Sequence, residues 1–315
     1  MSLKINTILY TFLASFISFS ASANFQPLTQ FGDNPGELSA SYFQSSNTSN
    51  SLIVLLHGCV QNGEALALQS GLVGLAKQNN LALLIPQQSG NNNVKSCFNW
   101  FSEQDNQKDQ GEVLSIKNMI LALKEKKQFK DVYIAGLSAG GAITSALLVH
   151  YPELFKGGAV VAGLPYPCAN DLAKAISCMR NGPSQSIDEL VVSAKVGNKD
   201  VVSWPSLLVI TGNDDAIVNP KNSRSLALQW ANLTKSDANE VKNSLPNYQK
   251  SQWVNNNNQA KVQLINIHNI GHGITVNPAL NHGGTNSTFL PKSSFDSVTA
   301  MLDFWKINGK VVKNQ

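Results

Sequence analysis

Charged side chains are scarce in this chain, at 14% of its 315 residues, and the two signs nearly balance, with 24 Lys and Arg against 20 Asp and Glu. A formal net charge of +4, with no basic cluster interleaved with aromatic residues, is too small to indicate nucleic-acid binding. Apolar runs long enough to span a bilayer are missing as well. We therefore expect no nucleic-acid partner and no membrane span in the mature chain.

The first 23 residues have the pattern of a secretory signal peptide. Lys4 precedes an uncharged apolar stretch from Ile5 to Phe19, and Ala21-Ser22-Ala23 supplies the small-x-small cleavage pattern. The alternative, a retained membrane anchor, needs a longer apolar stretch than this one. We expect a mature chain that starts at Asn24, is secreted or periplasmic, and has a net charge of +3 after the loss of Lys4.

Apolar runs of strand length alternate with helical patterns in the mature chain. The predicted buried strands are 52–56, 81–85, 132–135, 158–162, 207–211 and 262–267. The predicted helices are 64–78, 112–127, 142–150 and 294–307. This alternation predicts an α/β fold, with a mostly parallel sheet covered by helices on both faces. The length suits a single domain, 24–315, in which 163–205 is an insertion near the rim of the functional site.

The segment Gly136-Leu137-Ser138-Ala139-Gly140 matches G-x-S-x-G, the pattern of a nucleophile elbow. A β-branched and aromatic run precedes it at 131–135, and a helical pattern follows it at 142–150. A strand, a sharp turn and a helix would hold the serine oxygen above the sheet, where the helix N-terminus meets developing negative charge. Ser138 is therefore predicted to be the nucleophile of a serine hydrolase.

A serine nucleophile needs a histidine base and an acid that orients it. His272 lies in the Gly271-His272-Gly273 loop after the last predicted strand, where the base follows the acid in chain order. His268 and His282 are the alternatives, and His150 is explained as a helix C-cap.

The acid is expected directly after the 207–211 strand, where Asp214 and Asp215 are adjacent. One of them is expected to satisfy turn N–H groups and the other to bind the Nδ1 side of the histidine. Strand–turn geometry alone leaves the choice between them open.

The oxyanion hole needs two backbone N–H groups aimed at one point. Ala139, next to the serine, supplies the first, and the loop after the 52–56 strand is expected to supply the second. Gly58 lets that loop turn without a Cβ clash, so the N–H of Cys59 is the candidate. His57 directly follows the strand and is predicted to brace this loop.

Only four cysteines are present, and their spacing fits no zinc pattern. No metal and no cofactor is expected. In an exported chain oxidised pairs are favoured, with Cys168–Cys178 as a local staple and Cys59–Cys97 across the catalytic end of the sheet. Four free buried thiols are the alternative.

The sequence resembles the poly(3-hydroxybutyrate) depolymerase family of α/β-hydrolases, which also includes secreted feruloyl and acetylxylan esterases. The matching segments, in the family's order, are Leu56–Gln61, Cys97–Phe101, Gly136–Gly141, Gly212–Val218 and Gly271–Gly273. The resemblance implies the α/β-hydrolase fold. The family's acid pattern G-x-x-D-x-x-V falls on Asp215, and its oxyanion position falls on Cys59. The C-x-N-W segment suggests Asn99 and Trp100 as substrate contacts. Trp253 and Trp305 are further aromatic candidates, and a place in the core is the alternative for each of the three tryptophans.

The resemblance implies a secreted serine esterase that acts on a hydroxyalkanoate polyester or its oligomers. The alternatives are a feruloyl or acetylxylan esterase and, outside enzymes, an inactive hydrolase-fold binding protein. The chain departs from the family pattern at Ile85-Pro86-Gln87-Gln88 and at Gly273-Ile274, on the substrate side of the expected site. We expect no separate substrate-binding domain of the kind found in many depolymerases that attack crystalline polymer. The identity of the ester and the oligomeric state stay open.

Overall fold

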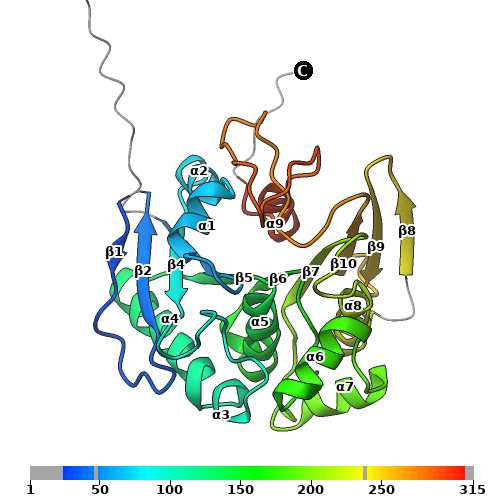
Figure 1. The fold of residues 1–315 in the computed structure, drawn as a ribbon, viewed down its shortest axis with the longest axis horizontal. Helices are drawn as coiled ribbons and strands as arrows, with labels where there is room; N and C mark the ends of the chain where they lie inside the picture. The colour runs from blue at the N-terminus through cyan, green and yellow to red at the C-terminus, as the bar shows by residue number, and fades with distance from the viewer. Residues whose placement is uncertain (1–23, 46–48, 237–239, 309–315) are drawn as a thin grey trace, which may run out of the picture.

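One sheet runs through the residues that this computed structural model describes, which are 24–45, 49–236 and 240–308 (Figure 1). The predicted signal peptide, 1–23, lies outside them. In chain order the strands are β1 (Gln26–Pro27), β2 (Ser39–Gln44), β3 (Ser51–Leu56), β4 (Ala82–Gln87), β5 (Asp131–Leu137), β6 (Gly157–Val161), β7 (Ser206–Gly212), β8 (Glu240–Ser244), β9 (Tyr248–Val254) and β10 (Ala260–Ile267).

The strand order across the sheet is β1-β2-β4-β3-β5-β6-β7-β10-β9-β8. All pairs from β4 through β10 in that order are parallel, and the pairs at both edges are antiparallel. Leu52, Val54 and Leu56 of β3 pack into the core on one face, whereas Ile53 and Leu55 pack into the core on the other. A strand with both faces covered must be apolar throughout, which is why these runs were recognisable in the sequence. The predicted mostly parallel α/β sheet is confirmed.

Helices cover both faces of the sheet (Figure 1). One face carries α1 (Gly63–Gln69), α2 (Leu72–Gln78) and α9 (Ser297–Trp305). The other carries α4 (Gly111–Lys127), α5 (Ala139–His150) and α8 (Lys221–Leu233). The shorter elements are α3 (Glu103–Asn106), η1 (Pro152–Leu154), α6 (Leu172–Asn181) and α7 (Ile187–Lys195). No helix in the described ranges is long and apolar enough to cross a membrane.

The single helix predicted over 64–78 is wrong, because the chain breaks between α1 and α2. Gly71 adopts a left-handed conformation with φ of 83° and caps the start of α2. A Cβ at this position would overlap the carbonyl oxygen of Gly283, so a distant loop packs against the break. Neither the left-handed turn nor its partner is visible in the local helical pattern.

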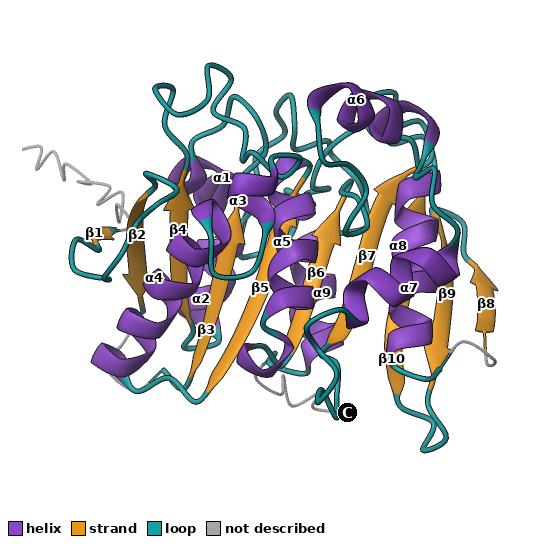
Figure 2. Ribbon diagram, turned by 90° about the horizontal axis from the view of Figure 1, so that it is seen from below, coloured by secondary structure: helices purple, strands orange, loops and turns teal. Residues whose placement is uncertain are grey.

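The predicted insertion at 163–205 contains two helices with different positions. Figure 2 shows α6 beyond the carboxyl ends of the strands, whereas α7 packs against α8 and α5 beside the sheet. Part of the segment therefore lies at the rim of the strand ends, and part belongs to the helical layer.

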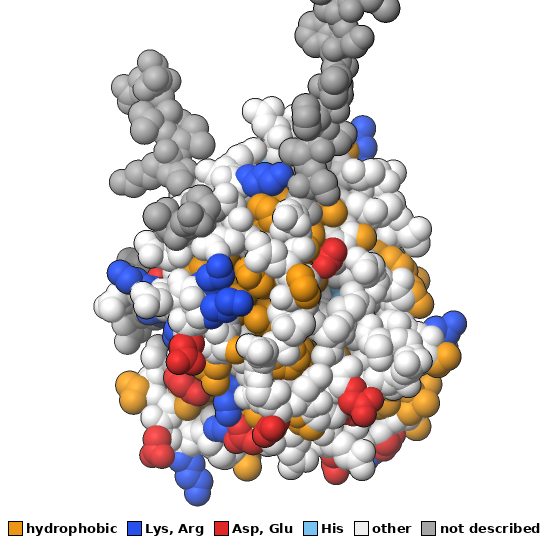
Figure 3. All heavy atoms as spheres, turned by 90° about the vertical axis from the view of Figure 1, so that its left-hand side faces the viewer, with side chains coloured by type: hydrophobic (Ala, Val, Ile, Leu, Met, Phe, Trp, Pro, Cys, Tyr) orange, Lys and Arg blue, Asp and Glu red, His pale blue; other side chains and the backbone are white. Residues whose placement is uncertain are grey.

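The β1–β2 edge of the sheet faces the viewer in Figure 3, where acidic and basic side chains form small separate groups around apolar atoms. The ammonium groups of Lys126 and Lys127 lie 5.9 and 5.5 Å from the ring centre of Tyr42 in β2. The edge strand itself is only two residues long. A short edge flanked by charge discourages pairing with the strands of another molecule.

Candidate active site

The carboxyl ends of the parallel strands bring the predicted site segments to one edge of the sheet, at the arrowheads in Figure 2. His57 follows β3, Ser138 follows β5, Asp215 lies three residues after β7, and His272 lies in the loop after β10. Pairing of β3 with β5 aligns Leu56 with Gly136, and pairing of β7 with β10 aligns Gly212 with Ile267. These registers place the loop after β3 beside the loop after β5, and the loop after β7 beside the loop after β10, with β6 between the two pairs.

Ser138 occupies the sharp turn between β5 and α5. Its φ of 57° and ψ of −120° lie in a region that a residue with a Cβ rarely adopts, so the turn is strained. The Ser138 N–H donates to the carbonyl of Val161 at 2.9 Å, which ties the turn to β6. A Cβ on Gly136 would overlap the Gly140 carbonyl, and one on Gly140 would overlap the Leu56 carbonyl. Both glycines of the G-x-S-x-G pattern are therefore required by close backbone contacts.

His272 and Asp215 form a hydrogen-bonded pair. Nδ1 of His272 donates to Oδ2 of Asp215 at 2.8 Å, and both side chains are almost fully buried. The other carboxylate oxygen accepts the N–H groups of Ile217 and Val218, each at 2.9 Å. These bonds hold the carboxylate still and keep the proton of the ring on Nδ1, which leaves Nε2 as the acceptor.

Asp214, the alternative acid, is exposed and is not the residue that pairs with His272. Its backbone N–H donates to the carbonyl of Ile270 at 3.0 Å, so it contributes to the turn. The structure thus pairs the histidine with the second of the two adjacent aspartates.

The other candidate histidines have partners elsewhere. His282 lies 3.3 Å from Asp296, the carboxylate that caps α9. His268 bonds a backbone carbonyl at 3.3 Å. His150 bonds the carbonyl of Asn106 at 2.9 Å, and burial lowers its pKa to about 4.

The loop after β3 adjoins the serine. A Cβ built on Gly58 would lie 3.4 Å from Cβ of Ser138. The Gly58 N–H donates to Oε1 of Gln61 and the Val60 N–H donates to the Lys95 carbonyl, both at 2.7 Å. Within the described residues, no hydrogen bond uses the Cys59 N–H between them. Ala139 is the first residue of α5, so its N–H has no acceptor within the helix either.

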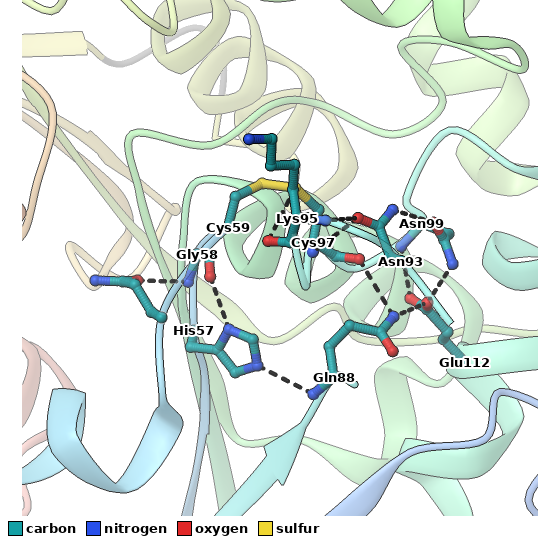
Figure 4. Close-up of a disulfide and its surroundings, with 10 residues drawn as sticks. His57, Gly58, Cys59, Gln88, Asn93, Lys95, Cys97, Asn99 and Glu112 are labelled. Atoms are coloured by element: carbon teal, nitrogen blue, oxygen red, sulfur yellow. Dashed lines mark hydrogen bonds between the residues drawn. A yellow bond between two sulfur atoms is a disulfide. The ribbon is translucent and has the colours of Figure 1, made fainter. Parts of the chain in front are cut away.

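His57 is fully buried beneath this loop. Its Nδ1–H donates to the Gly58 carbonyl at 2.7 Å, and its Nε2 accepts the Gln88 N–H at 3.1 Å (Figure 4). Since Nε2 accepts a hydrogen bond, it carries no proton and the ring is neutral, and burial lowers the pKa of His57 as well. His57 therefore braces the loop, as its position after the strand suggested.

Two disulfides, Cys59–Cys97 and Cys168–Cys178, are present, and they are the pairs favoured from the sequence. The first joins the loop after β3 to the segment before α3 (Figure 4). The second joins the loop after β6 to α6.

Asn99 and Trp100, the predicted substrate contacts, are both engaged by other parts of the protein. Trp100 is 8% exposed and lies in the core, with its ring edge-on to Phe101. Asn99 is held by Glu112, which accepts its Nδ2 at 2.9 Å and its backbone N–H at 2.8 Å. Trp253 and Trp305, at 0% and 6% exposed, are also core residues. The buried carboxyl group of Glu112 draws the segment of Asn99 and Trp100 toward the protein interior, and the sequence pattern gave no sign of this contact.

A cavity that the sequence did not reveal lies between the loop after β3, α1 and the segment 287–290. Its volume is about 260 Å³, and it is lined by Val60, Gln61, part of α1 and the segment 287–290. The ring of Phe289, on its wall, meets the His272 ring edge-on at 6.3 Å between centres. A larger cavity of about 760 Å³ opens near Ser206, at the amino end of β7, and is therefore remote from the serine.

Comparison with known proteins agrees with this architecture. The chain is 32% identical over 290 residues to poly(3-hydroxyalkanoate) depolymerase C of Paucimonas lemoignei, covering 89% of this chain and 70% of that one. It is 25% identical over 283 residues to feruloyl esterase B of Thermothelomyces thermophilus, covering 84% and 95%. The structure of an acetyl xylan esterase from Aspergillus awamori superposes with a TM-score of 0.74 at 18% identity, covering 90% and 99%.

The fold and these relatives define an α/β-hydrolase esterase, an enzyme that hydrolyses carboxylic esters. Within that class the chain belongs to the esterase PHB depolymerase family, whose model matches residues 42–242. The alternative of an inactive binding protein is not favoured by these matches.

Proposed function

We propose that Ser138, His272 and Asp215 form the catalytic triad of this esterase, and that the N–H groups of Cys59 and Ala139 form its oxyanion hole. The observation that carries this proposal is the buried Asp215–His272 hydrogen bond, which lies on the same sheet edge as the strained Ser138 turn. The second part is supported by two unused N–H groups, that of Cys59 in the loop that adjoins the serine and that of Ala139, the residue after the serine.

In this mechanism Nε2 of His272 takes the proton from Oγ of Ser138 as the oxygen attacks the ester carbonyl. The negative charge that develops on the carbonyl oxygen is stabilised by the two N–H groups. His272 then returns the proton to the departing alcohol, which leaves an acyl-serine. A water molecule, deprotonated by His272, attacks the acyl-serine and releases the acid, and the proton returns to Ser138.

We also propose that the enzyme is secreted or periplasmic and consists of one catalytic domain. Residues 24–315 would form one catalytic domain, with 163–205 inserted, after cleavage of the signal peptide 1–23. Two disulfides support export to the periplasm or the medium, because such bonds persist in oxidising compartments. A single continuous sheet supports one domain.

The substrate we propose is a hydroxyalkanoate polyester or its oligomers. The 32% identity to a poly(3-hydroxyalkanoate) depolymerase supports this choice. The small cavity bordered by Phe289, whose ring meets that of His272, suits a short acyl unit. Feruloyl or acetylxylan esters are the second candidates, since the relatives include a feruloyl esterase and an acetyl xylan esterase.

The physical state of the polymer is expected to decide the rate. A catalytic domain that acts alone has no independent means of concentrating itself on an insoluble surface. We expect good turnover of dissolved hydroxybutyrate oligomers and short p-nitrophenyl esters, and slow or no erosion of crystalline film. The measurement is the initial rate per enzyme on oligomer and film at matched ester content, with feruloyl and acetyl esters in the same panel. Film erosion as fast as oligomer cleavage would show that a surface-binding patch exists in this domain.

The Cys59–Cys97 disulfide is expected to matter for catalysis as well as stability. The double variant Cys59→Ser, Cys97→Ser should lose on the order of 10-fold in kcat, because the loop that carries the Cys59 N–H loosens. The matched control, Cys168→Ser with Cys178→Ser, should lower Tm and leave kcat within about twofold, since that bond lies away from the oxyanion loop. Equal kcat values in the two double variants, or peptide mapping that links Cys59 to Cys168 or Cys178, would contradict this assignment.

A further inference from the structure

Glu112 is a fully buried carboxyl group that the mechanism above does not use. It lies in the first turn of α4, a position where acidic residues are ordinarily exposed to solvent. Burial, together with the nearby charge of Asp105, raises its pKa to about 8. Burying such a group is costly unless its hydrogen bonds are satisfied. The partners of Glu112 therefore indicate what it does.

The carboxyl group of Glu112 accepts three hydrogen bonds from two residues (Figure 4). Oε1 accepts from Nε2 of Gln88 and from Nδ2 of Asn99, and Oε2 accepts the backbone N–H of Asn99. Gln88 directly follows β4, and Asn99 lies two residues beyond Cys97. Glu112 thus joins the two segments that lie behind the oxyanion loop.

The first branch runs through Gln88 to the peptide unit between Gly58 and Cys59. The Gln88 N–H donates to Nε2 of His57, and Nδ1–H of His57 donates to the Gly58 carbonyl. The Gly58 carbonyl and the Cys59 N–H belong to one planar peptide unit and point in opposite directions. Holding that carbonyl oxygen in place therefore fixes the direction of the Cys59 N–H.

The second branch reaches Cys59 through its disulfide partner. Nε2 of Gln88 donates to the Cys97 carbonyl at 3.2 Å, and the Cys97 N–H donates to Oδ1 of Asn93 at 3.2 Å. Asn93 in turn donates to Oδ1 of Asn99 at 2.7 Å, so both anchors of Cys97 lead back to Glu112. Glu112 therefore restrains Cys59 in two ways, through the peptide unit between Gly58 and Cys59 and through the disulfide to Cys97.

We propose that Glu112 is a positioning residue for ester hydrolysis, which aims the Cys59 N–H at the reacting carbonyl oxygen by anchoring Gln88 and Asn99. This inference depends on the proposed place of the Cys59 N–H in the oxyanion hole. Glu112 touches neither substrate nor the triad, and acts through the residues that it holds.

The test is Glu112→Gln, measured at a pH above the raised pKa of Glu112, where the ionised carboxylate accepts with both oxygens. The substitution keeps the shape of the side chain and replaces one acceptor oxygen by an NH₂ group. All the groups that face Glu112 are donors, so the new NH₂ meets a donor in either orientation. The Gln88 amide cannot flip without loss, because its Oε1 already accepts the Ser89 N–H and Nδ2 of Asn92, both at 2.9 Å. The strain must therefore be relieved by movement of the anchored segments.

We expect kcat of Glu112→Gln to fall on the order of 10-fold, with KM within about threefold, because oxyanion stabilisation acts on the transition state. Affinity for an alkyl boronic acid, whose serine adduct is tetrahedral, should fall by a similar factor. Rates are normalised to the folded enzyme by end-point titration with a fluorophosphonate. A merely structural role would lower the titratable fraction and leave the rate per site unchanged.

Ser115→Ala is the matched control on the same helix. Ser115 is equally buried, accepts the Gly36 N–H at 2.9 Å and donates to the Gly111 carbonyl at 3.0 Å, outside the Glu112 network. It should lower Tm while kcat per site and boronate affinity stay within about twofold of the wild type.

Asn93→Ala is the second variant, for use if Glu112→Gln does not fold. We expect it to fold, because Asn93 is only half-buried and the Glu112 carboxyl group stays in place. It removes the anchor of the Cys97 N–H, and a smaller loss in kcat and boronate affinity is expected, again without a matching change in KM. If the folded Glu112→Gln and Asn93→Ala variants keep kcat per site and boronate affinity within about twofold of the wild type, the positioning role is overturned. Ser138→Ala is measured in the same series. If it is inactive, unchanged values in the Glu112 and Asn93 variants overturn only the role of Glu112. If Ser138→Ala is active, the proposed triad itself is overturned.

Discussion

Replacing Ser138 by alanine is expected to abolish ester hydrolysis, with a loss in kcat on the order of 10⁴-fold or more. The variant removes the oxygen that would form the acyl-enzyme, and the remaining triad members cannot act without it. Only one half-buried hydroxyl is lost, and alanine tolerates the turn at φ of 57° about as well as serine does. The measurement is kcat on a soluble p-nitrophenyl ester, with circular dichroism and Tm showing that the fold is kept.

Fluorophosphonate labelling supplies the control for this variant. The wild-type enzyme should take up one label, and Ser138→Ala should take up none. A well-folded Ser138→Ala enzyme that retains a tenth of the wild-type rate would disprove the assignment of the nucleophile.

Asp215→Asn is expected to reduce kcat/KM by about 10³- to 10⁴-fold. The Asn oxygen can still accept the N–H groups of Ile217 and Val218, so the turn persists. Its NH₂ group would then face the Nδ1–H of His272, where two donors cannot bond. The ring must take the other tautomer, with the proton on Nε2, and in that form it cannot accept the serine proton.

Asp214→Asn is the matched control, one residue away in the same turn. Asp214 is exposed, and its backbone bond to Ile270 does not involve the side chain. We expect its kcat/KM to stay within about threefold of the wild type. The reverse ranking of the two variants would mean that Asp214 is the orienting acid.

The central strands and the elbow were predictable because their causes are local. A parallel strand covered on both faces must be apolar where it is buried, as β3 and β5 are after their first residues. The edge strands β2, β8 and β9 were not predicted, because half-exposed strands mix polar and apolar residues without a distinct run. The break at Gly71 was missed because its cause is the loop at Gly283, more than 200 residues further along the chain.

The sequence by itself determined the family resemblance, the strand–turn–helix around Ser138 and the segments that supply the candidate acid and base. Only the tertiary structure showed the hydrogen bond between His272 and Asp215, the acid that the resemblance implied, and tied Asn99 to Glu112, because side-chain contacts depend on which segments the fold brings side by side. Glu112 shows this most clearly. In the sequence it is an ordinary acid in the first turn of a helix, yet the fold buries it between the segments of Gln88 and Cys97. Hydrogen bonding and desolvation act through space, so its role is set by neighbours that local sequence does not contain.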